Sequence, residues 1–171
     1  MTSTRFWLVA AGAAALLGLT VIARSMNMAS TAPAEKLDLS LSFEDVDGRA
    51  VSLSRFEGKP LVINLWGTWC GPCRIEMPQL NELSAKYRDR GLTVVGISVD
   101  DPPDDIRAFV KEFGVTYPIL AGLNHPEALE ALGYYGGVPM SIFVRADGTV
   151  SHRLLGIATT AAWERRIEAL F

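Results

Sequence analysis

The sequence predicts an α/β sandwich built around a mixed central sheet. Two apolar, β-branched runs, at residues 61–66 and 92–99, alternate with stretches of helical character. Two Asp-Gly pairs separate short apolar runs, a pattern typical of β-hairpins. The chain has 171 residues, of which 49% are hydrophobic and 20% charged, so it fits a single packed domain and is not a disordered chain.

The first half of the globular part combines a hairpin, a central strand and a long helix. An alternating strand is predicted before the Asp47-Gly48 turn and returns at residues 51–53. Its apolar positions are Leu37, Leu39, Leu41 and Phe43. The run at 61–66 is apolar on both faces, which is typical of a central strand. A helix is predicted over residues 71–90, interrupted or kinked at Pro78 and ended by Gly91.

The second half continues the alternation of strands and helices. The predicted strands cover residues 92–99, 117–120, 141–145 and 150–155, the last two joined as a hairpin by Asp147-Gly148. The predicted helices cover residues 106–113, 126–132 and 161–170. The acidic, proline-containing stretch 100–105 is predicted as a solvated loop leading into a helix.

An uncharged segment precedes this domain. Residues 6–23 lie between Arg5 and Arg24, and as a helix they would reach about 27 Å, close to the ~30 Å of a bilayer core. Two interpretations compete, an uncleaved signal anchor and a cleaved signal peptide. A buried core helix fits less well, because the segment is apolar on all sides. In both leading interpretations the positive end stays in the cytoplasm and the remainder is exported.

The chain is therefore divided into three parts. Residues 1–24 form a signal anchor or signal peptide, residues 25–36 a flexible linker, and residues 37–171 the folded domain. The expected location is the cytoplasmic (inner) membrane with the domain facing the periplasm or the outside, or the soluble periplasm after cleavage. Disulfides persist in such compartments.

The chain's two cysteines, Cys70 and Cys73, enclose Gly71-Pro72 where the predicted central strand meets the next helix. Unpaired N–H groups and the helix dipole stabilise a thiolate at Cys70, which lowers its pKa and makes it a nucleophile. Pro72 suits the first turn because its missing N–H is not needed there. Cys73 lies one turn inward and is expected to be shielded. The exposed Cys70 would attack a partner disulfide, and Cys73 would resolve the mixed disulfide.

Other uses of this pair fit less well. A purely structural disulfide would close a very small loop and would stabilise little. Zinc needs about four ligands, and neither His125 nor His152 has finger-like spacing; both are expected at the surface. We expect no metal and no cofactor. The net charge of −3 gives no electrostatic case for nucleic acid.

The motifs together resemble the TlpA/ResA/CcmG class of membrane-tethered, thioredoxin-like proteins. The first group of matching residues is Phe43, Asp47-Gly48, Val51-Ser52-Leu53, Phe56, Gly58-Lys59, Asn64-Leu65-Trp66-Gly67-Thr68-Trp69-Cys70-Gly71-Pro72-Cys73, Arg74, Glu76, Met77 and Pro78. The second group is Gly137-Val138-Pro139, Phe143-Val144, Asp147-Gly148 and Gly156. The similarity covers residues 37–171. It implies a thioredoxin-like sandwich with an N-terminal β-hairpin extension and an inserted helix and strand before a cis-proline.

The resemblance assigns that cis-proline to Pro139. The backbone at Val138 would then face the cysteines and pair with a substrate chain by strand-like hydrogen bonds. Trp69, Gly71 and Pro72 would contact the substrate beside it, with Trp69 as an apolar platform. Met140 stands where relatives often have threonine, so the substrate contacts at this point can differ.

Glu76 is the candidate proton carrier. It follows Cys73 by three residues and so lies on roughly the same helix face, where a carboxylate moves protons or tunes the thiol pKa values. The resemblance to the ResA branch implies the same role. Ordinary thioredoxins carry a buried aspartate where this chain has Asn64, which does not titrate. Trp66 is expected in the core.

The resemblance implies an exported thiol-disulfide oxidoreductase that works mainly as a reductant. The Gly-Pro pair between the cysteines is similar to that of thioredoxin, whose potential is about −270 mV, and unlike strongly oxidising DsbA at about −120 mV. Electrons would come from a membrane protein of the DsbD/CcdA type. The expected clients are apocytochrome c, through its CxxCH thiols, or copper-site proteins of respiratory oxidase assembly.

Three alternative functions remain. The domain could be an oxidant or isomerase of disulfides, or a chaperone that binds Cu(I) through the same two thiolates. A peroxiredoxin shares the opening hairpin, but its reactive cysteine usually follows a Pro-x-x-x-Thr-x-x pattern. Here Ile63 and Gly67 occupy the Pro and Thr positions before Cys70.

Overall fold

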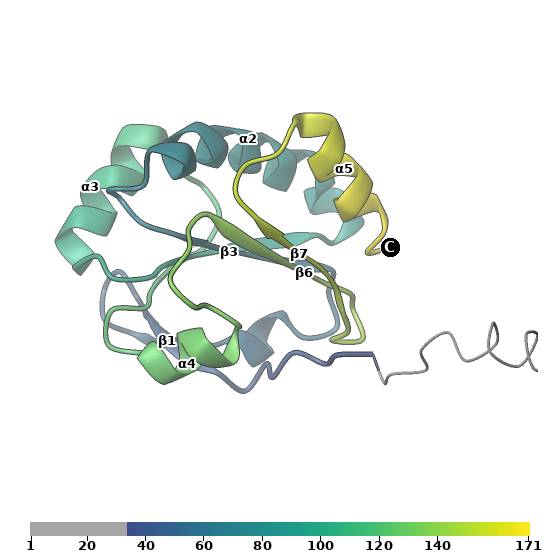
Figure 1. The fold of residues 1–171 in the computed structure, drawn as a ribbon, viewed down its shortest axis with the longest axis horizontal. Helices are drawn as coiled ribbons and strands as arrows, with labels where there is room; N and C mark the ends of the chain where they lie inside the picture. The colour runs from purple at the N-terminus through teal and green to yellow at the C-terminus, as the bar shows by residue number, and fades with distance from the viewer. Residues whose placement is uncertain (1–33) are drawn as a thin grey trace, which may run out of the picture. The chain divides into compact units, whose positions relative to one another are not determined.

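The structure is a computed structural model that describes residues 34–171 (Figure 1). The predicted signal anchor or signal peptide at residues 1–24, and most of the linker, lie outside the described residues. Between residues 34 and 171, no helix is both long and apolar enough to cross a membrane.

Within the described part, seven strands form one sheet in the order β2-β1-β5-β4-β3-β6-β7. They are β1 (Ser42–Asp45), β2 (Ala50–Ser52), β3 (Leu61–Trp66), β4 (Thr93–Ser98), β5 (Ile119–Ala121), β6 (Met140–Val144) and β7 (Val150–Leu155). β3 runs parallel to β4 and antiparallel to β6, so the sheet is mixed, as predicted. Every residue of β3 is buried, which explains its apolar residues on both faces.

Helices cover both faces of this sheet. They are α2 (Gly71–Tyr87), α3 (Pro103–Phe113), α4 (Pro126–Ala131) and α5 (Thr160–Glu168), with short 3-10 turns at η1 (Leu53–Phe56) and η2 (Arg88–Arg90). Figure 1 shows α2, α3 and α5 on one side of the sheet and α4 on the other. This arrangement confirms the predicted thioredoxin-like sandwich.

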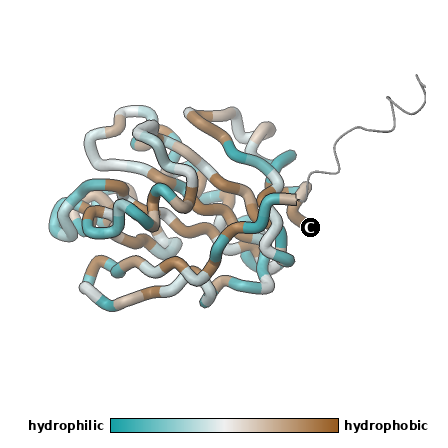
Figure 2. The backbone as a smooth tube through the Cα atoms, turned by 60° about the horizontal axis from the view of Figure 1, so that its bottom comes forward, coloured by the Kyte–Doolittle hydropathy of each residue, from teal (hydrophilic) through white to brown (hydrophobic). Residues whose placement is uncertain are grey.

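Two hydrophobic clusters hold the layers together, one on each face of the sheet. Val62 and Trp66 of β3 pack under α2, α3 and α5, whereas Ile63 and Leu65 face α4 and η1. This alternation follows from the two-residue period of a strand. Figure 2 shows the hydrophobic segments running through the inside of the domain and hydrophilic segments on the outer loops.

The N-terminal hairpin is present but shorter than predicted. The strand was expected from Leu37, and β1 begins at Ser42. The Asp38 carboxylate accepts hydrogen bonds from the N–H (2.9 Å) and hydroxyl (2.6 Å) of Ser40, so residues 38–40 turn instead of extending. β1 then pairs antiparallel with both β2 and β5, which makes the hairpin an extension of the sheet.

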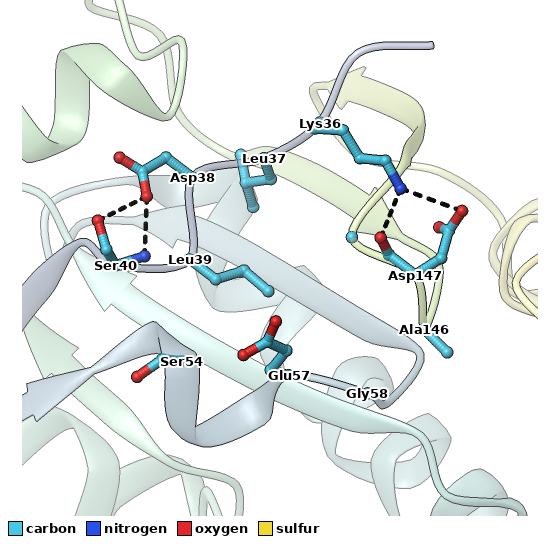
Figure 3. A pocket seen from close by; sticks show the side chains of 11 residues that line it. Lys36, Leu37, Asp38, Leu39, Ser40, Ser54, Glu57, Gly58, Ala146 and Asp147 are labelled. Carbon is cyan, nitrogen blue, oxygen red and sulfur yellow. Dashed lines mark hydrogen bonds and ion pairs between the residues drawn. The ribbon is translucent and has the colours of Figure 1, made fainter.

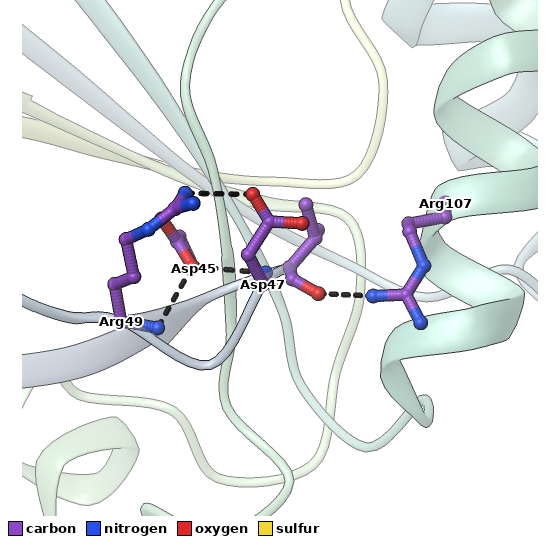
Figure 4. A network of polar contacts seen from close by, with 5 residues as sticks. Asp45, Asp47, Arg49 and Arg107 are labelled. Carbon is purple, nitrogen blue, oxygen red and sulfur yellow. Dashed lines mark hydrogen bonds and ion pairs between the residues drawn. The ribbon is translucent and has the colours of Figure 1, made fainter.

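The tip of the hairpin is tied to α3. Arg49 pairs with Asp47 at 2.7 Å, and its N–H donates to the Asp45 carboxylate at 2.9 Å. Arg107 of α3 donates to the carbonyl of Val46 (Figure 4). The contact fixes the hairpin against a helix that lies far along the chain.

Helix ends differ from the prediction where proline is involved. α3 begins at Pro103, inside the stretch predicted as a loop, because proline fits the first turn of a helix. α2 continues through Pro78, which the prediction had as an interruption or kink. The end is as predicted: η2 finishes at Gly91, whose φ of 92° is left-handed and suits glycine.

The first described residues are fastened at one end of the sheet. Leu37 donates its N–H to the carbonyl of Gly148 at 3.0 Å, and Lys36 Nζ contacts Asp147 at its carbonyl (2.6 Å) and carboxylate (3.2 Å) (Figure 3). A pocket of about 550 Å³ lies here, lined also by Gly58. Gly58 precedes β3, whereas the cysteines follow it, so this is the end of the sheet opposite to the cysteines.

Candidate active site

Cys70 and Cys73 form a disulfide where β3 leads into α2, with their Cα atoms 5.3 Å apart. Cys70 is the N-cap of α2, and its Sγ accepts the N–H of Cys73 at 3.1 Å. That N–H and the helix dipole stabilise a thiolate on Cys70 once the disulfide is reduced. Both residues are covered in this oxidised form, with Cys70 only 4% and Cys73 1% exposed. The expected exposure of Cys70 is therefore wrong for the disulfide form, although Cys70 remains the more exposed of the two.

The loop before Cys70 is clamped by Asp101. Its carboxylate accepts the N–H (2.8 Å) and hydroxyl (2.6 Å) of Thr68, and the hydroxyl of Ser98 at 2.6 Å. Asp101 is buried, so the prediction of a solvated loop is wrong at this residue. The sequence did contain a hint of this buried role, because Asp101 comes one residue after Asp100 and shortly after a buried strand. The clamp joins the ends of β3 and β4 and holds the backbone leading into the cysteines.

Trp69 forms an exposed surface beside the cysteines. Its side chain is 60% exposed, and its indole N–H donates to Asp100 at 2.8 Å. The ring folds back over Gly67, where an added Cβ would lie 2.8 Å from ring atoms. A side chain at position 67 would therefore push the indole out of this position. The position of Trp69 suits the predicted platform, and Gly71 and Pro72 are also exposed.

The peptide bond between Val138 and Pro139 is cis, as predicted. Pro139 directly precedes β6, whose Met140 pairs with Leu65 near the end of β3. This pairing brings the cis-proline to the end of the sheet from which Cys70 emerges. The carbonyl of Pro139 accepts the N–H of Gly156 at 2.8 Å, while Val138 stays half-buried.

Glu76 is buried beneath α2, only 1% exposed, one turn after Cys73. Asn64 Nδ2 donates to its Oε1 at 2.8 Å and also to the hydroxyl of Ser141 at 2.9 Å. Burial raises the pKa of Glu76 to about 7, against the smaller lowering effect of the Asn64 hydrogen bond. A carboxyl with this pKa exchanges protons near neutral pH.

Sequence reasoning placed Asn64 but missed Ser141. A serine inside the otherwise apolar run of β6 was the signal, because such a residue needs a buried partner. Trp66 is fully buried in the core, as predicted, and His152 is exposed, as predicted. His125 is half-buried, and its ring lies 5.5 Å from that of Phe43, so the prediction of a surface residue is wrong. The loop that carries it folds back over β1.

Comparisons with known proteins agree with this geometry. The sequence profile of the AhpC/TSA family matches residues 29–153. Thiol-disulfide oxidoreductase ResA of Geobacillus thermodenitrificans is 32% identical over 162 residues, covering 91% of this chain and 88% of the relative. ResA of Bacillus cereus is 30% identical over 128 residues, covering 74% of this chain and 72% of the relative.

A solved structure shows the same fold. The thiol:disulfide interchange protein of the thioredoxin family from Chlorobium tepidum superposes with a TM-score of 0.73 at 29% identity, covering 82% of this chain and 99% of that chain. The cysteine pair at the helix N-terminus, the cis-proline and these relatives lead to one assignment. The chain belongs to the AhpC/TSA family and is a thioredoxin-like thiol-disulfide oxidoreductase of the ResA type.

Proposed function

We propose that this protein reduces disulfides of extracytoplasmic proteins by dithiol exchange at Cys70 and Cys73. One observation carries the proposal: a buried carboxyl, Glu76, lies one turn from the inner cysteine and has a pKa raised to about 7. A dithiol that must release a proton from its shielded sulfur needs such an acceptor.

Exchange would take two steps. The Cys70 thiolate attacks one sulfur of the client disulfide, the client S–S bond breaks, and the released client thiolate takes up a proton. Glu76 then accepts the proton of the Cys73 thiol. The Cys73 thiolate attacks Cys70 Sγ, so that the Cys70–Cys73 disulfide forms and the second client thiolate leaves and is protonated. Two electrons pass from the protein dithiol to the client disulfide.

The client would dock on the surface that surrounds Cys70. Trp69, Gly71 and Pro72 are exposed there, and the backbone of Val138, before the cis peptide bond, would pair with an extended client segment. Leu155, at the end of the strand next to β6, adds an exposed apolar side chain. These contacts support a client that presents its cysteines in an extended stretch flanked by apolar residues.

Apocytochrome c, with the thiols of its CxxCH motif, and copper-site assembly proteins of respiratory oxidases are the proposed clients. The electron donor would be a membrane dithiol protein of the DsbD/CcdA type. The uncharged segment at residues 6–23 supports attachment of the protein to the cytoplasmic membrane, with its domain outside. The names of the ResA relatives support thiol-disulfide exchange as the reaction.

Trapping tests the order of the two cysteines. In the full chain, Cys73→Ser is expected to accumulate a mixed disulfide with an oxidised CxxCH peptide, because the resolving sulfur is lost. Cys70→Ser is the matched control and is expected to accumulate none. Mixed disulfides can be counted by mass spectrometry after alkylation. If Cys70→Ser traps the peptide and Cys73→Ser does not, the assigned roles are reversed.

The equilibrium potential of the Cys70/Cys73 couple tests the direction. A value near −270 mV, as in thioredoxin, would support a reductant that is recharged through the membrane. A value near −120 mV, as in DsbA, would make the protein an oxidant or isomerase and would overturn the cytochrome proposal. The measurement is a titration against a dithiothreitol or glutathione buffer, followed by tryptophan fluorescence.

A further inference from the structure

Four buried polar atoms around Glu76 have no hydrogen-bond partner among residues 34–171. Two are acceptors, Asn64 Oδ1 and Glu76 Oε2, and two carry donor hydrogens, Trp66 Nε1 and the hydroxyl of Tyr117. A buried polar group without a partner is unfavourable, and such groups are uncommon in folded proteins. Donors and acceptors in equal number are chemically complementary if they lie close together.

The surroundings of Gly96 place the side chains of Trp66 and Tyr117 close to each other. Gly96 of β4 is the direct strand neighbour of Asn64. A Cβ added at Gly96 would lie 3.1 Å from Trp66 Nε1 and 3.2 Å from Cε2 of Tyr117. The indole N–H and the phenol ring therefore both lie over Gly96, next to the strand position of the amide that holds Glu76.

Tyr117 is also electrostatically linked to Glu76. Its pKa is raised above the usual value, first by burial and then by the negative charge of Glu76. Cys73 lies one turn before Glu76 on α2, Tyr117 lies before β5, and β3 and β6 contribute the neutral side chains of Asn64 and Ser141 to the hydrogen bonds at the carboxyl.

Tyr117 is only 5% exposed and its hydroxyl is buried, but the residue borders the surface. It lines an open pocket of about 360 Å³ together with Ser84, Thr93 and Thr116, and Arg88 is the charged residue of that lining. The pocket lies between the later turns of α2 and the start of β4, away from the cysteine end of the sheet. It would stay open to solvent while a client covers Cys70.

We propose that Tyr117 and Trp66 bind ordered water against Glu76, and that Tyr117 is the positioning residue through which Glu76 exchanges its proton with solvent. The inference rests on the proposed role of Glu76 in exchange. Glu76 takes the proton of Cys73 and hands one to the bridging water. The Tyr117 hydroxyl accepts a proton from this water as it gives its own to a water that enters from the pocket, so the phenol stays neutral. Polar, multiply bonded sites of this kind are where buried water is held.

Tyr117→Phe in the full chain tests the proposal, since it removes one oxygen and keeps the ring. The Glu76 carboxyl is followed directly by ¹³C NMR or by its infrared band, without any client. We expect its pKa to rise by about 0.5–1 unit, because a hydrogen-bond donor to the charged form is lost. The rate of mixed-disulfide resolution with a small disulfide is expected to fall about three- to tenfold.

Tyr87→Phe is the matched control. Tyr87 is another buried tyrosine, at the end of α2, and its ring stacks on that of Phe171 with a centroid distance of 6.3 Å. We expect it to change neither the pKa of Glu76 nor the rate. An equal shift in both variants would mean a general loosening of α2 and would overturn the proposal.

The double variant separates a proton route from a packing role. In a Glu76→Gln background, Tyr117→Phe is expected to add no further loss of rate. If Tyr117→Phe lowers the rate in the Glu76→Gln background as much as it does in the parent, the proton route is overturned. An unchanged Glu76 pKa in the single variant Tyr117→Phe would also overturn it. If Glu76→Gln by itself leaves the rate unchanged, the proposed function loses its proton acceptor and the route fails with it. The carboxyl titration therefore tells the two failures apart.

Discussion

Glu76 shows how one buried side chain ties the chemistry of the site to the stability of the fold. Its carboxyl lies under α2, with one oxygen bonded to Asn64 and its pKa raised to about 7. In the unfolded chain the same group titrates near 4.5. The native state therefore holds a proton more tightly than the unfolded state does. Stability is complete below about pH 4.5 and is lost as the pH rises through about 7.

Glu76→Gln is expected to remove this pH dependence. Glutamine keeps the shape and never charges, so the variant should be more stable than the parent at pH 8, by up to roughly 3 kcal/mol. At pH 4 the two proteins should differ much less. Urea unfolding of the oxidised proteins at both pH values measures the difference. A parent whose stability does not fall between pH 5 and pH 8 would contradict the raised pKa.

The residues of the site differ in how far sequence could predict them. Cys70, Cys73 and Pro139 stand in local patterns whose chemistry depends on their immediate neighbours. The burial of Glu76 depends on how α2 packs on the sheet. Its partner Asn64 contacts Ser141, 77 residues further along the chain. No local pattern contains such a contact, so Ser141 was missed.

At the scale of elements, the site is held by the ends of strands rather than by the cysteine loop itself. Asp101, just after β4, bonds to Thr68 after β3 and to Ser98 within β4. One buried carboxylate thus fixes the spacing of two parallel strands where α2 begins. The prediction of a solvated loop failed at Asp101 because acidic residues usually favour solvent. Asp101 is buried because the folded chain brings three hydrogen-bond donors to its carboxylate.

Asp101→Ala is expected to destabilise the protein by about 2–4 kcal/mol, because it leaves buried donors unpaired. It should also slow disulfide exchange, since the loop leading into Cys70 loses its support. Asp105→Ala is the matched control, as Asp105 is exposed in the first turn of α3, and it should cost at most about 1 kcal/mol. Thermal unfolding and the exchange rate are the measurements. Equal effects of the two substitutions would show that Asp101 does not act as a clamp.

For the whole molecule, the alternation of strands and helices predicted the class of fold, because hydrophobic period depends on local sequence. Strand order did not follow from it. The hairpin β1–β2 joins the sheet beside β5, more than 70 residues later in the chain, through the pairs Glu44↔Ala121 and Asp45↔Leu120. Contacts between α3 and the hairpin tip support this pairing. The pairing of strands that are far apart in the chain depends on packing, so a local stretch of sequence cannot predict it.

The fastening of Lys36 and Leu37 against residues 147–148 gives the domain two poles. The first described residues lie at one end of the domain, and Cys70 and Cys73 lie at the other. The length of β3, about 20 Å, separates these two ends. A group attached to the chain just before Lys36 would therefore lie at the opposite end of the domain from Cys70 and Cys73. Coupled to a chip or a carrier protein through the residue before Ala34, the domain should exchange disulfides as fast as it does free in solution. The same coupling at Leu155, beside the cis-proline, should block it.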